Sequence, residues 1–337
     1  MNFETINIEK GMYASPEKSF TQVLEELDPS ANYIGTALEG MDAYQRQLKR
    51  FDIKVSGAGS DMVQKFFTST GSSALFPEYV SRAVRQGMEE ANLISSVVAT
   101  VTKINSMDYR TIASVPSEDD KSLKKVAAGA AIPETRIKTQ ENLVKLHKRG
   151  RMLVAPYEAL KYQRLDLFTV TLKQIGAYIA RQQFQDAVDV LVNGDGNNNA
   201  ATKITAATTG TLAYTDLISL VNTLDPYTLN TLIAPPDMMI AMLNLKEFQN
   251  PQTGINFQGT GKLNRPMGAN FLKSKSVDSG HIIALDKDCA LEMVVAADVL
   301  VDYDKLIDRQ LERAAVTSTS GFAKIFPDAS AVLKVSE

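Results

Sequence analysis

The sequence predicts an α+β fold in which helices and strands alternate irregularly. One stretch, from about Asp166 to Val192, keeps an apolar stripe at helical spacing for roughly 26 residues, or about 40 Å of helix. After residue 205, β-branched runs instead mix with short amphipathic helices bounded by proline and glycine. Because we find neither a repeat of fixed period nor a regular βαβ alternation, the mixture indicates α+β.

The composition is that of a globular protein. The 337 residues are 44% hydrophobic and 22% charged with a net charge of -3, which excludes whole-chain disorder and a global basic field for nucleic acid. The single cysteine, Cys289, excludes an intrachain disulfide. The N-terminal segment lacks the pattern of a signal peptide, and no apolar run approaches the ~18 residues of a membrane span. We therefore expect a soluble protein made in a cytoplasm.

Residues 1–75 contain two short helical patterns, in SFTQVLEELDPS and MDAYQRQLKRFDIKV. Glycine, asparagine and proline separate them, and the sequence shows no shared core. We predict an N-terminal arm that lies on another surface. The alternative is a small helical cap packed on the same chain.

The next segments predict a helix, a strand and a long two-stranded excursion. Residues 76–93 place Pro77 in the first turn of a helix with one apolar face, and residues 94–104 alternate as a strand. Residues 105–150, called the excursion below, run out and back through a charged tip. Because an isolated hairpin is marginal in water, it must pack on its own domain or be supported by another chain.

The long helix ends in VLVNGDGNNNA. Counted from Asp195 as a calcium loop, this stretch has Ala200 and Ala206 where the loop needs glycine and glutamate. A phosphate cradle is also excluded, because the glycines follow a helix instead of opening one. Asn193 and Gly194 suit the left-handed conformation that ends a helix, so we predict a helix stop.

The second half of the chain predicts short alternating elements. We expect a helix capped by Thr215, a buried strand ended by two prolines, and another helix directly after them. Strands follow on both sides of a turn within residues 281–304, and closing strands lie around a Pro-Asp turn within residues 312–335.

The side chains offer no recognisable catalytic or metal-binding set. His147, His281 and Cys289 are too few for a zinc site. GINFQGTGKL differs from a P-loop, because Asn256 and Leu263 occupy positions that need glycine and Ser or Thr. The chain contains no nucleophile elbow, CxxC pair, HExxH helix or GxGxxG turn. We predict no catalytic residues, no cofactor and no metal.

The charged stretches favour contacts between protein surfaces. KLHKRGRML is the most basic run, but no aromatic residues accompany it, and on a strand its charges divide between two faces. SEDDKSLKK at the tip sets acid beside base, which steers association more than it adds affinity; the alternative is a merely solvated tip. The candidate inter-subunit contact residues are Glu118, Asp119, Asp120, Lys121, Lys124, Lys125, Lys145, Lys148, Arg149 and Arg151.

Three segments in this order resemble the major capsid proteins of tailed bacteriophages with the Hong Kong 97-type fold. The first runs from GAAIPETRIKTQENLVKLHKRGRMLV through the long helix to NGDG, and is similar to the returning strand of the extended loop and the spine helix. The second, SGHIIALDKDCALEMVVAADVLVDYDK, is similar to a late axial-domain segment, and GFAKIFPDASAVLKV to the closing strands. The ordered set, over about residues 75–337, carries the resemblance.

The resemblance implies domain boundaries. We expect an N-terminal arm at 1–75, an extended loop at 105–150 that lies over a neighbouring subunit, and an axial domain at 206–305. The peripheral domain, with its spine helix, takes residues 76–104, 151–205 and 306–337.

The resemblance also implies assembly instead of catalysis. Copies form hexamers and pentamers of an icosahedral shell around double-stranded DNA, and many weak contacts add by multivalency. The implied partners are the chain itself, scaffold, portal and decoration proteins, and DNA without sequence-specific contacts, with no membrane. The shell belongs to a virion and is assembled in the bacterial host cytoplasm. Some relatives join subunits by Lys–Asn bonds, for which Lys121, Lys124 and Lys125 are the loop-tip candidates.

Two other functions stay open at this point. An encapsulin, a bacterial compartment shell of the same fold, holds a cargo enzyme, and fold alone does not separate it from a capsid. An α+β enzyme with unmarked carboxylates predicts a monomer or small oligomer with a concave polar pocket.

Overall fold

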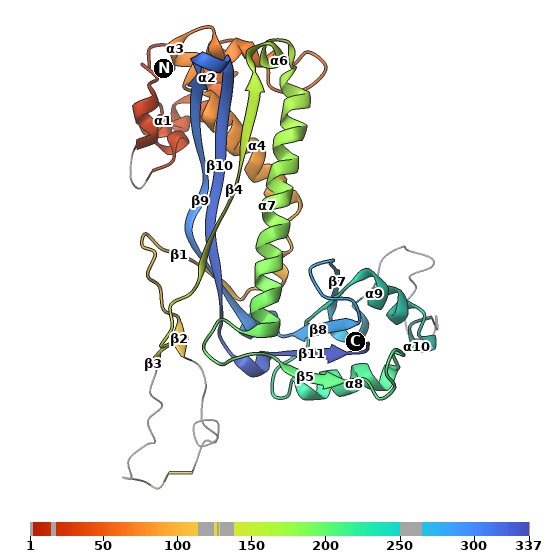
Figure 1. Ribbon diagram of the computed structural model, residues 1–337. Coiled ribbons are helices and arrows are strands. Elements are labelled where there is room, and N and C mark those ends of the chain that lie inside the picture. Colours follow the sequence, from red (N-terminus) through yellow and green to blue (C-terminus); the bar gives the residue numbers. More distant parts are fainter. Residues whose placement is uncertain are drawn as a thin grey trace. The chain divides into compact units, whose positions relative to one another are not determined.

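The computed structural model describes residues 3–14, 18–113, 125–126, 128, 138–249 and 265–336. The chain forms two compact units, each assembled from three separate stretches (Figure 1). Unit 1 comprises Met1–Ala91, Arg149–Ile179 and Val299–Ser318, and unit 2 comprises Asn92–Lys148, Ala180–Asp298 and Thr319–Glu337. Within the described residues, no helix combines the length and apolar character needed to cross a bilayer.

The N-terminal part of unit 1 is a helical cap. α1 (Phe20–Leu27) and α2 (Ala43–Arg50) begin in capping boxes at Ser19 and Asp42, as their helical patterns suggest. Their apolar side chains share one core with α4 (Phe76–Glu90), which has Pro77 in its first turn as predicted. The described part of residues 1–75 is therefore a cap packed on its own chain, the alternative to the predicted arm. Contact between this cap and a neighbouring subunit stays a prediction.

The predicted long helix is confirmed as α7 (Leu165–Asn193), which follows the short α6 (Tyr157–Tyr162). Its first half belongs to unit 1 and its second half to unit 2. The predicted stripe is buried in both units, at Leu172, Ile175 and Ile179 and then at Phe184, Val188 and Leu191. The helix ends where Gly194 adopts a φ of 82°, as the helix stop requires.

Within unit 1, α7 crosses α4 at two glycines. A Cβ added to Gly87 would lie 2.0 Å from the carbonyl oxygen of Lys173. One added to Gly176 would lie 2.0 Å from the carbonyl oxygen of Val84. Because only glycine leaves room for this approach, the two helix backbones are in direct contact.

A four-stranded sheet has the order β1-β9-β10-β4. In unit 1, α4 and α7 cover one face of this sheet, where Val299 and Val316 are buried in the helical core. Leu153 and Ala155 pack against the same core. The strands are β1 (Thr100–Lys103), β4 (Leu146–Pro156), β9 (Leu291–Leu306) and β10 (Leu311–Lys324).

Unit 2 contains a five-stranded sheet with the order β5-β11-β8-β6-β7. β11 is parallel to β5 and antiparallel to β8, while β6 is antiparallel to β8 and parallel to β7. The strands are β5 (Thr202–Thr205), β6 (Thr231–Ala234), β7 (Asn270–Lys273), β8 (His281–Leu285) and β11 (Ser330–Lys334). The helices are α8 (Tyr214–Thr223), α9 (Pro236–Leu243), α10 (Lys246–Gln249) and α12 (Lys287–Ala290).

This sheet is buried on both faces. Ile233, Ile283 and Val332 share a core with the second half of α7. Their strand neighbours Leu232 and Leu333 pack instead with α8 and α9. A sheet between two helical layers needs strands that are apolar throughout, which explains the predicted strand LNTLIAPP, observed as β6.

Two local predictions are wrong. α8 is not capped by Thr215, which lies inside its first turn; the Asp216 carboxylate accepts hydrogen bonds from the backbone N–H groups of Ala213 and Ala207 at 2.9 and 3.0 Å. The strand expected from residue 94 begins only at Thr100, because residues 94–96 form a 3₁₀ turn. The Asn92 side chain favours that turn by accepting the Ile94 N–H at 2.8 Å.

The two ends of the excursion pair with each other and pack on unit 2. β2 (Ile112–Ala113) is antiparallel to β3 (Lys138–Thr139). Val144 is buried with Val294 and Ala323, and Tyr109 packs against the same cluster. The described base of the excursion thus packs on its own domain, one of the two alternatives that the sequence left open. Contact of the excursion with a neighbouring subunit, which the resemblance implies, stays a prediction.

Candidate inter-subunit surfaces

The structure describes half of the predicted contact residues. Glu118, Asp119, Asp120, Lys121 and Lys124 lie outside the described residues. Lys125 is exposed, as are Lys145, Lys148 and Arg151, while Arg149 is half-buried. The last four lie just before or on β4, at one edge of the four-stranded sheet. The structure therefore gathers four basic residues along one edge strand, and their contact with a neighbour stays a prediction.

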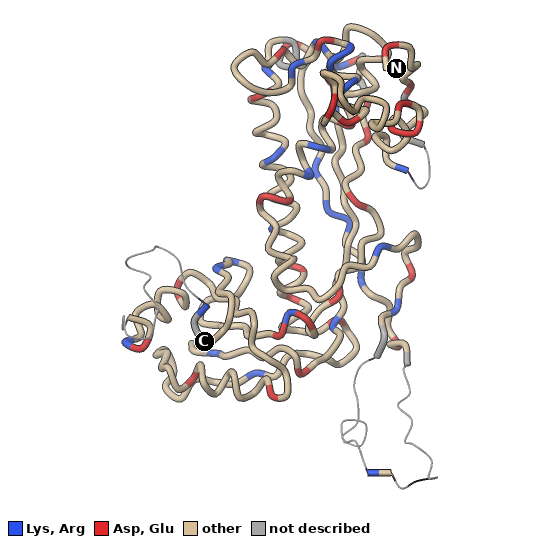
Figure 2. Tube along the Cα trace, turned by 180° about the vertical axis from the view of Figure 1, so that it is seen from behind, with Lys and Arg blue, Asp and Glu red and all other residues tan. Residues whose placement is uncertain are grey.

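Charge is not concentrated on either unit. Acidic and basic positions are interspersed along the described chain (Figure 2). By strand alternation, Lys148 lies on one face of β4, and Arg149 and Arg151 lie on the other. At the start of β4, His147 Nδ1 lies 3.5 Å from Asp186 Oδ2 of α7. The basic run thus divides between two faces, as the strand interpretation expects.

Three exposed apolar side chains lie on unit 1, on the face of the sheet that points away from the helices. Met152 and Val154 of β4 are each 53% exposed, and Leu300 of β9 is 55% exposed. Their strand neighbours Leu153 and Val299 belong to the helical core, so alternation places these three on the opposite face. We call Met152, Val154 and Leu300 the outer face. The sequence analysis missed this face. The apolar residues at both odd and even positions of β4 indicated that both faces of the strand are apolar.

The first half of α7 carries a second exposed apolar set. Leu167, Val170 and Tyr178 are 59%, 61% and 50% exposed. They lie off the buried stripe of the helix, where a monomeric protein normally places polar residues. Both exposed sets in unit 1 therefore fit a subunit that is completed by neighbours.

A buried carboxylate holds the outgoing limb of the excursion. Glu292 of β9 is only 6% exposed. Its Oε1 accepts hydrogen bonds from Thr102 Oγ1 at 2.5 Å and Tyr109 Oη at 2.8 Å, and its Oε2 accepts one from Thr111 Oγ1 at 2.6 Å. We call these three donors the hydroxyl cradle. Burial and then the hydrogen bond to Glu292 raise the pKa of Tyr109, so the phenol stays a donor at neutral pH.

The loop after α7 holds the returning limb. Asn197 Oδ1 accepts the Asn142 N–H at 3.1 Å, and Asn197 Nδ2 donates to Gln140 Oε1. Asp195 Oδ1 accepts from Asn197 Nδ2 at 2.9 Å and from the Asn197 N–H at 3.1 Å. The stretch that resembled a metal or phosphate loop therefore uses its polar side chains to bind its own chain.

The same loop is joined to β10. Asp195 Oδ2 accepts the Lys324 N–H at 3.0 Å. The Lys324 side chain is fully buried, and its Nζ donates to the Leu191 carbonyl oxygen at 3.2 Å. Burial lowers the pKa of this amine to about 8, although the nearby Asp195 and Asp328 act in the opposite direction.

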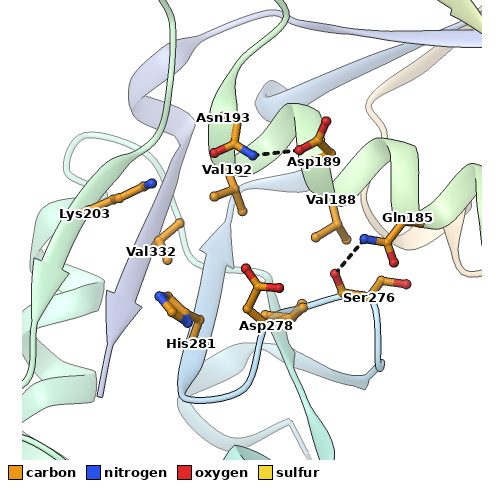
Figure 3. Close-up of a pocket in the computed structure, with 11 residues that line it drawn as sticks. Gln185, Val188, Asp189, Val192, Asn193, Lys203, Ser276, Asp278, His281 and Val332 are labelled. Carbon is orange, nitrogen blue, oxygen red and sulfur yellow. Dashed lines mark hydrogen bonds between the residues drawn. The ribbon is translucent and has the colours of Figure 1, made fainter. Parts of the chain in front are cut away.

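A small polar pocket lies in unit 2 between the second half of α7 and the turn before β8 (Figure 3). Its volume of about 170 Å³ is below the ~300 Å³ at which small-molecule sites begin. Asn193 donates to Asp189 at 2.7 Å, and Gln185 donates to the Ser276 carbonyl oxygen at 3.3 Å. These hydrogen bonds join α7 to itself and to the turn before β8. Its charged and imidazole side chains are Asp189, Lys203, Asp278 and His281.

Solved structures share this fold at low sequence identity. A crystal structure of a virus-like particle from Pyrococcus furiosus matches with a TM-score of 0.51 and 15% identity, over 77% of this chain and 99% of that chain. The capsid of a native GTA particle matches with a TM-score of 0.54 and 14% identity, over 75% and 91%. The capsid of the cyanophage P-SCSP1u matches with a TM-score of 0.52 and 15% identity, over 73% and 88%.

The sequence itself matches one family. No curated protein matches the chain. The family model described as "Phage capsid protein" matches residues 139–325, more than half of the chain. The predicted α+β class and Hong Kong 97-like fold are confirmed. This chain belongs to the phage capsid protein family and is a structural protein of a capsid shell.

Proposed function

We propose that this protein is the major capsid protein of a tailed bacteriophage or prophage. Its copies form the hexamers and pentamers of an icosahedral shell that encloses double-stranded DNA. The observation that carries the proposal is the family match over more than half of the chain, together with the shared fold of solved capsid structures. The exposed apolar side chains of the outer face suit contacts with neighbouring copies.

In this proposal the domains keep the boundaries expected from the sequence. Residues 76–104, 151–205 and 306–337 form the peripheral domain, and residues 206–305 form the axial domain. The excursion lies over a neighbouring subunit, with the basic residues of β4 at its root. The modest net charge of -3 suits a shell that encloses DNA without sequence-specific contacts. Scaffold, portal and decoration proteins are further partners, and assembly takes place in the host cytoplasm.

Size-exclusion chromatography and negative-stain microscopy of the full chain test assembly. We expect rings of five and six subunits or closed shells, because many weak contacts add by multivalency. A monomer at every concentration, with no chemical cross-links between copies, would contradict the proposal.

The contents of the particles separate a capsid from an encapsulin. Particles purified from cells that carry the gene at its natural locus are treated with nuclease and then opened. Nuclease-resistant double-stranded DNA of uniform length supports the phage capsid. A single enclosed enzyme without DNA supports the compartment shell instead.

A further inference from the structure

We propose that Glu292 and Asn197 are positioning residues for assembly, which fix the two limbs of the excursion to unit 2 and so set the direction in which the excursion leaves it. The inference rests on the proposed function, in which the excursion reaches a neighbouring subunit. It concerns only the described base of the excursion, residues 105–113 and 138–145.

The first anchor is the buried carboxylate of Glu292. Burying a charge is unfavourable unless hydrogen bonds replace its water. At Glu292 the replacement comes from hydroxyl groups alone, since within the described chain no ion pair to this carboxylate is found. Two of the three donors, Tyr109 and Thr111, belong to the outgoing limb. One acidic side chain therefore ties that limb to β9 at two points.

The second anchor is the side-chain amide of Asn197, whose oxygen and nitrogen both form hydrogen bonds. Asn197 Oδ1 accepts from the Asn142 N–H, while its Nδ2 donates to Gln140 and to Asp195. In the same loop, the Gly196 carbonyl oxygen accepts from Asn142 Nδ2 at 2.8 Å. An aspartate at position 197 would lose the donor and set a second negative charge beside Asp195. This site therefore distinguishes an asparagine from its closest substitute.

The two limbs are also hydrogen-bonded to each other, so both anchors hold the same paired segment of the excursion. The Gln140 N–H donates to the Thr111 carbonyl oxygen at 2.9 Å, and the Val144 N–H donates to the Tyr109 carbonyl oxygen at 2.9 Å. Residues at the start of β4 approach β10 so closely that a Cβ on Gly321 would lie 2.3 Å from the Lys145 carbonyl oxygen. An excursion held at both limbs leaves unit 2 in one direction, whereas an excursion held at one limb can pivot.

These anchors are polar contacts, distinct from the apolar packing that holds α4, α7, α8 and the two sheets. Glu292 is flanked on β9 by Leu291 and Met293, which belong to one of those cores, and the glutamine of E292Q keeps nearly the same size and shape beside them. Loosening an anchor is therefore expected to free the base of the excursion while the rest of the subunit stays folded. That separation makes the positioning role testable.

The test compares E292Q and N197D with the wild-type full chain. Two matched variants serve as controls in unit 2. E247Q makes the same Glu-to-Gln change at an exposed site on α10, and N270D makes the same amide-to-acid change at an exposed site. Hydrogen exchange is followed by mass spectrometry on dilute, unassembled protein over residues 104–113 and 138–145. Assembly is measured as the fraction of protein in closed shells on a density gradient.

We expect each anchor variant to exchange at least about tenfold faster over the limb that it holds. E292Q removes the charge that strengthens the three hydrogen bonds to Glu292, and N197D loses the donor to Gln140. We expect the melting temperature of each anchor variant to stay within about 3 °C of the wild type, its closed shells to fall several-fold, and malformed particles to appear. The controls should match the wild type in every readout.

Three results would overturn the inference. Faster exchange in the limbs with a normal yield of closed shells would show that the direction of the excursion does not govern assembly. Unchanged exchange in the limbs, or a general loss of protection and a large fall in melting temperature, would show that the residues do not act as local anchors. A wild-type chain that never assembles would contradict the proposed function itself, and the exchange data would still report separately whether the anchors exist.

Discussion

At the scale of single residues, the most unusual group is the amine of Lys324, which is fully buried on β10. It donates a hydrogen bond to the Leu191 carbonyl oxygen, and burial lowers its pKa from 10.5 to about 8. Because the folded-state pKa lies below the unfolded one, this group destabilises the folded chain fully at pH values below about 8. The penalty fades as the pH rises from about 8 toward 10.5.

We therefore expect K324M to stabilise the subunit at pH 7. The pKa difference between 10.5 and about 8 corresponds to about 3 kcal/mol at most, and a methionine keeps the stem packed. Chemical denaturation of the wild type and the variant at pH 7 and pH 10 measures the effect. The gain should be larger at pH 7; an equal gain at both values would contradict the assigned cause.

Arg46 in the helical cap is a buried residue of the opposite kind, because its charge is well paired. It is fully buried, its Nε donates to Asp28 Oδ2 at 2.8 Å, and its guanidinium lies 4.3 Å from the centre of the Tyr33 ring. Its Nη1 also donates to the Met41 carbonyl oxygen at 2.7 Å. A single cation thus connects three segments of the cap.

R46M should destabilise the cap by about 3–5 kcal/mol, because it leaves the buried Asp28 carboxylate without its partner. The double variant D28N/R46M should recover part of the loss, since no fully buried charge is then left without its counter-ion. The free energy of unfolding of the single and double variants decides this. A double variant less stable than R46M alone would show that the unpaired charge is not the cause.

At the scale of elements, the sequence predicts what depends on neighbours along the chain. The period of α7, its stop at Gly194 and the strand β6 all follow from local spacing and composition. The anchors of the excursion do not, because the donors to Glu292 lie 181, 183 and 190 residues away in sequence. The sequence left the cap as an alternative to an arm for the same reason, since its short helices gain their core by packing on α4 and α7.

The contact between α4 and α7 gives a prediction at this scale. G87A or G176A places a methyl group 2.0 Å from a backbone oxygen of the other helix, so the helices must separate. Such overpacking typically costs about 1–3 kcal/mol. The melting temperature of each variant tests this against G59A, where the nearest atom is a flexible lysine end at 3.4 Å. Equal melting temperatures for G87A and G59A would contradict the close contact.

At the scale of the whole molecule, the outer face should matter to the shell and not to the subunit. Val154 is 53% exposed, so V154D should change subunit stability by no more than about 0.5 kcal/mol. It should nevertheless abolish closed shells, because a charge would be buried between copies. V154T, which keeps the shape, should reduce assembly only mildly. Normal shells from V154D, counted by electron microscopy, would remove the outer face from the proposed interface.

The interleaving of the two units has a consequence for how the protein is made. Each unit takes three stretches of the chain, and β5 is joined to its sheet only through β11, which begins at Ser330. While a ribosome is still translating earlier residues, the five-stranded sheet therefore lacks the strand that connects β5 to β8. A chain stopped before that residue cannot close this sheet, so prematurely terminated products are left for chaperones and proteases. The last described strand must therefore be translated before the five-stranded sheet of the subunit is complete.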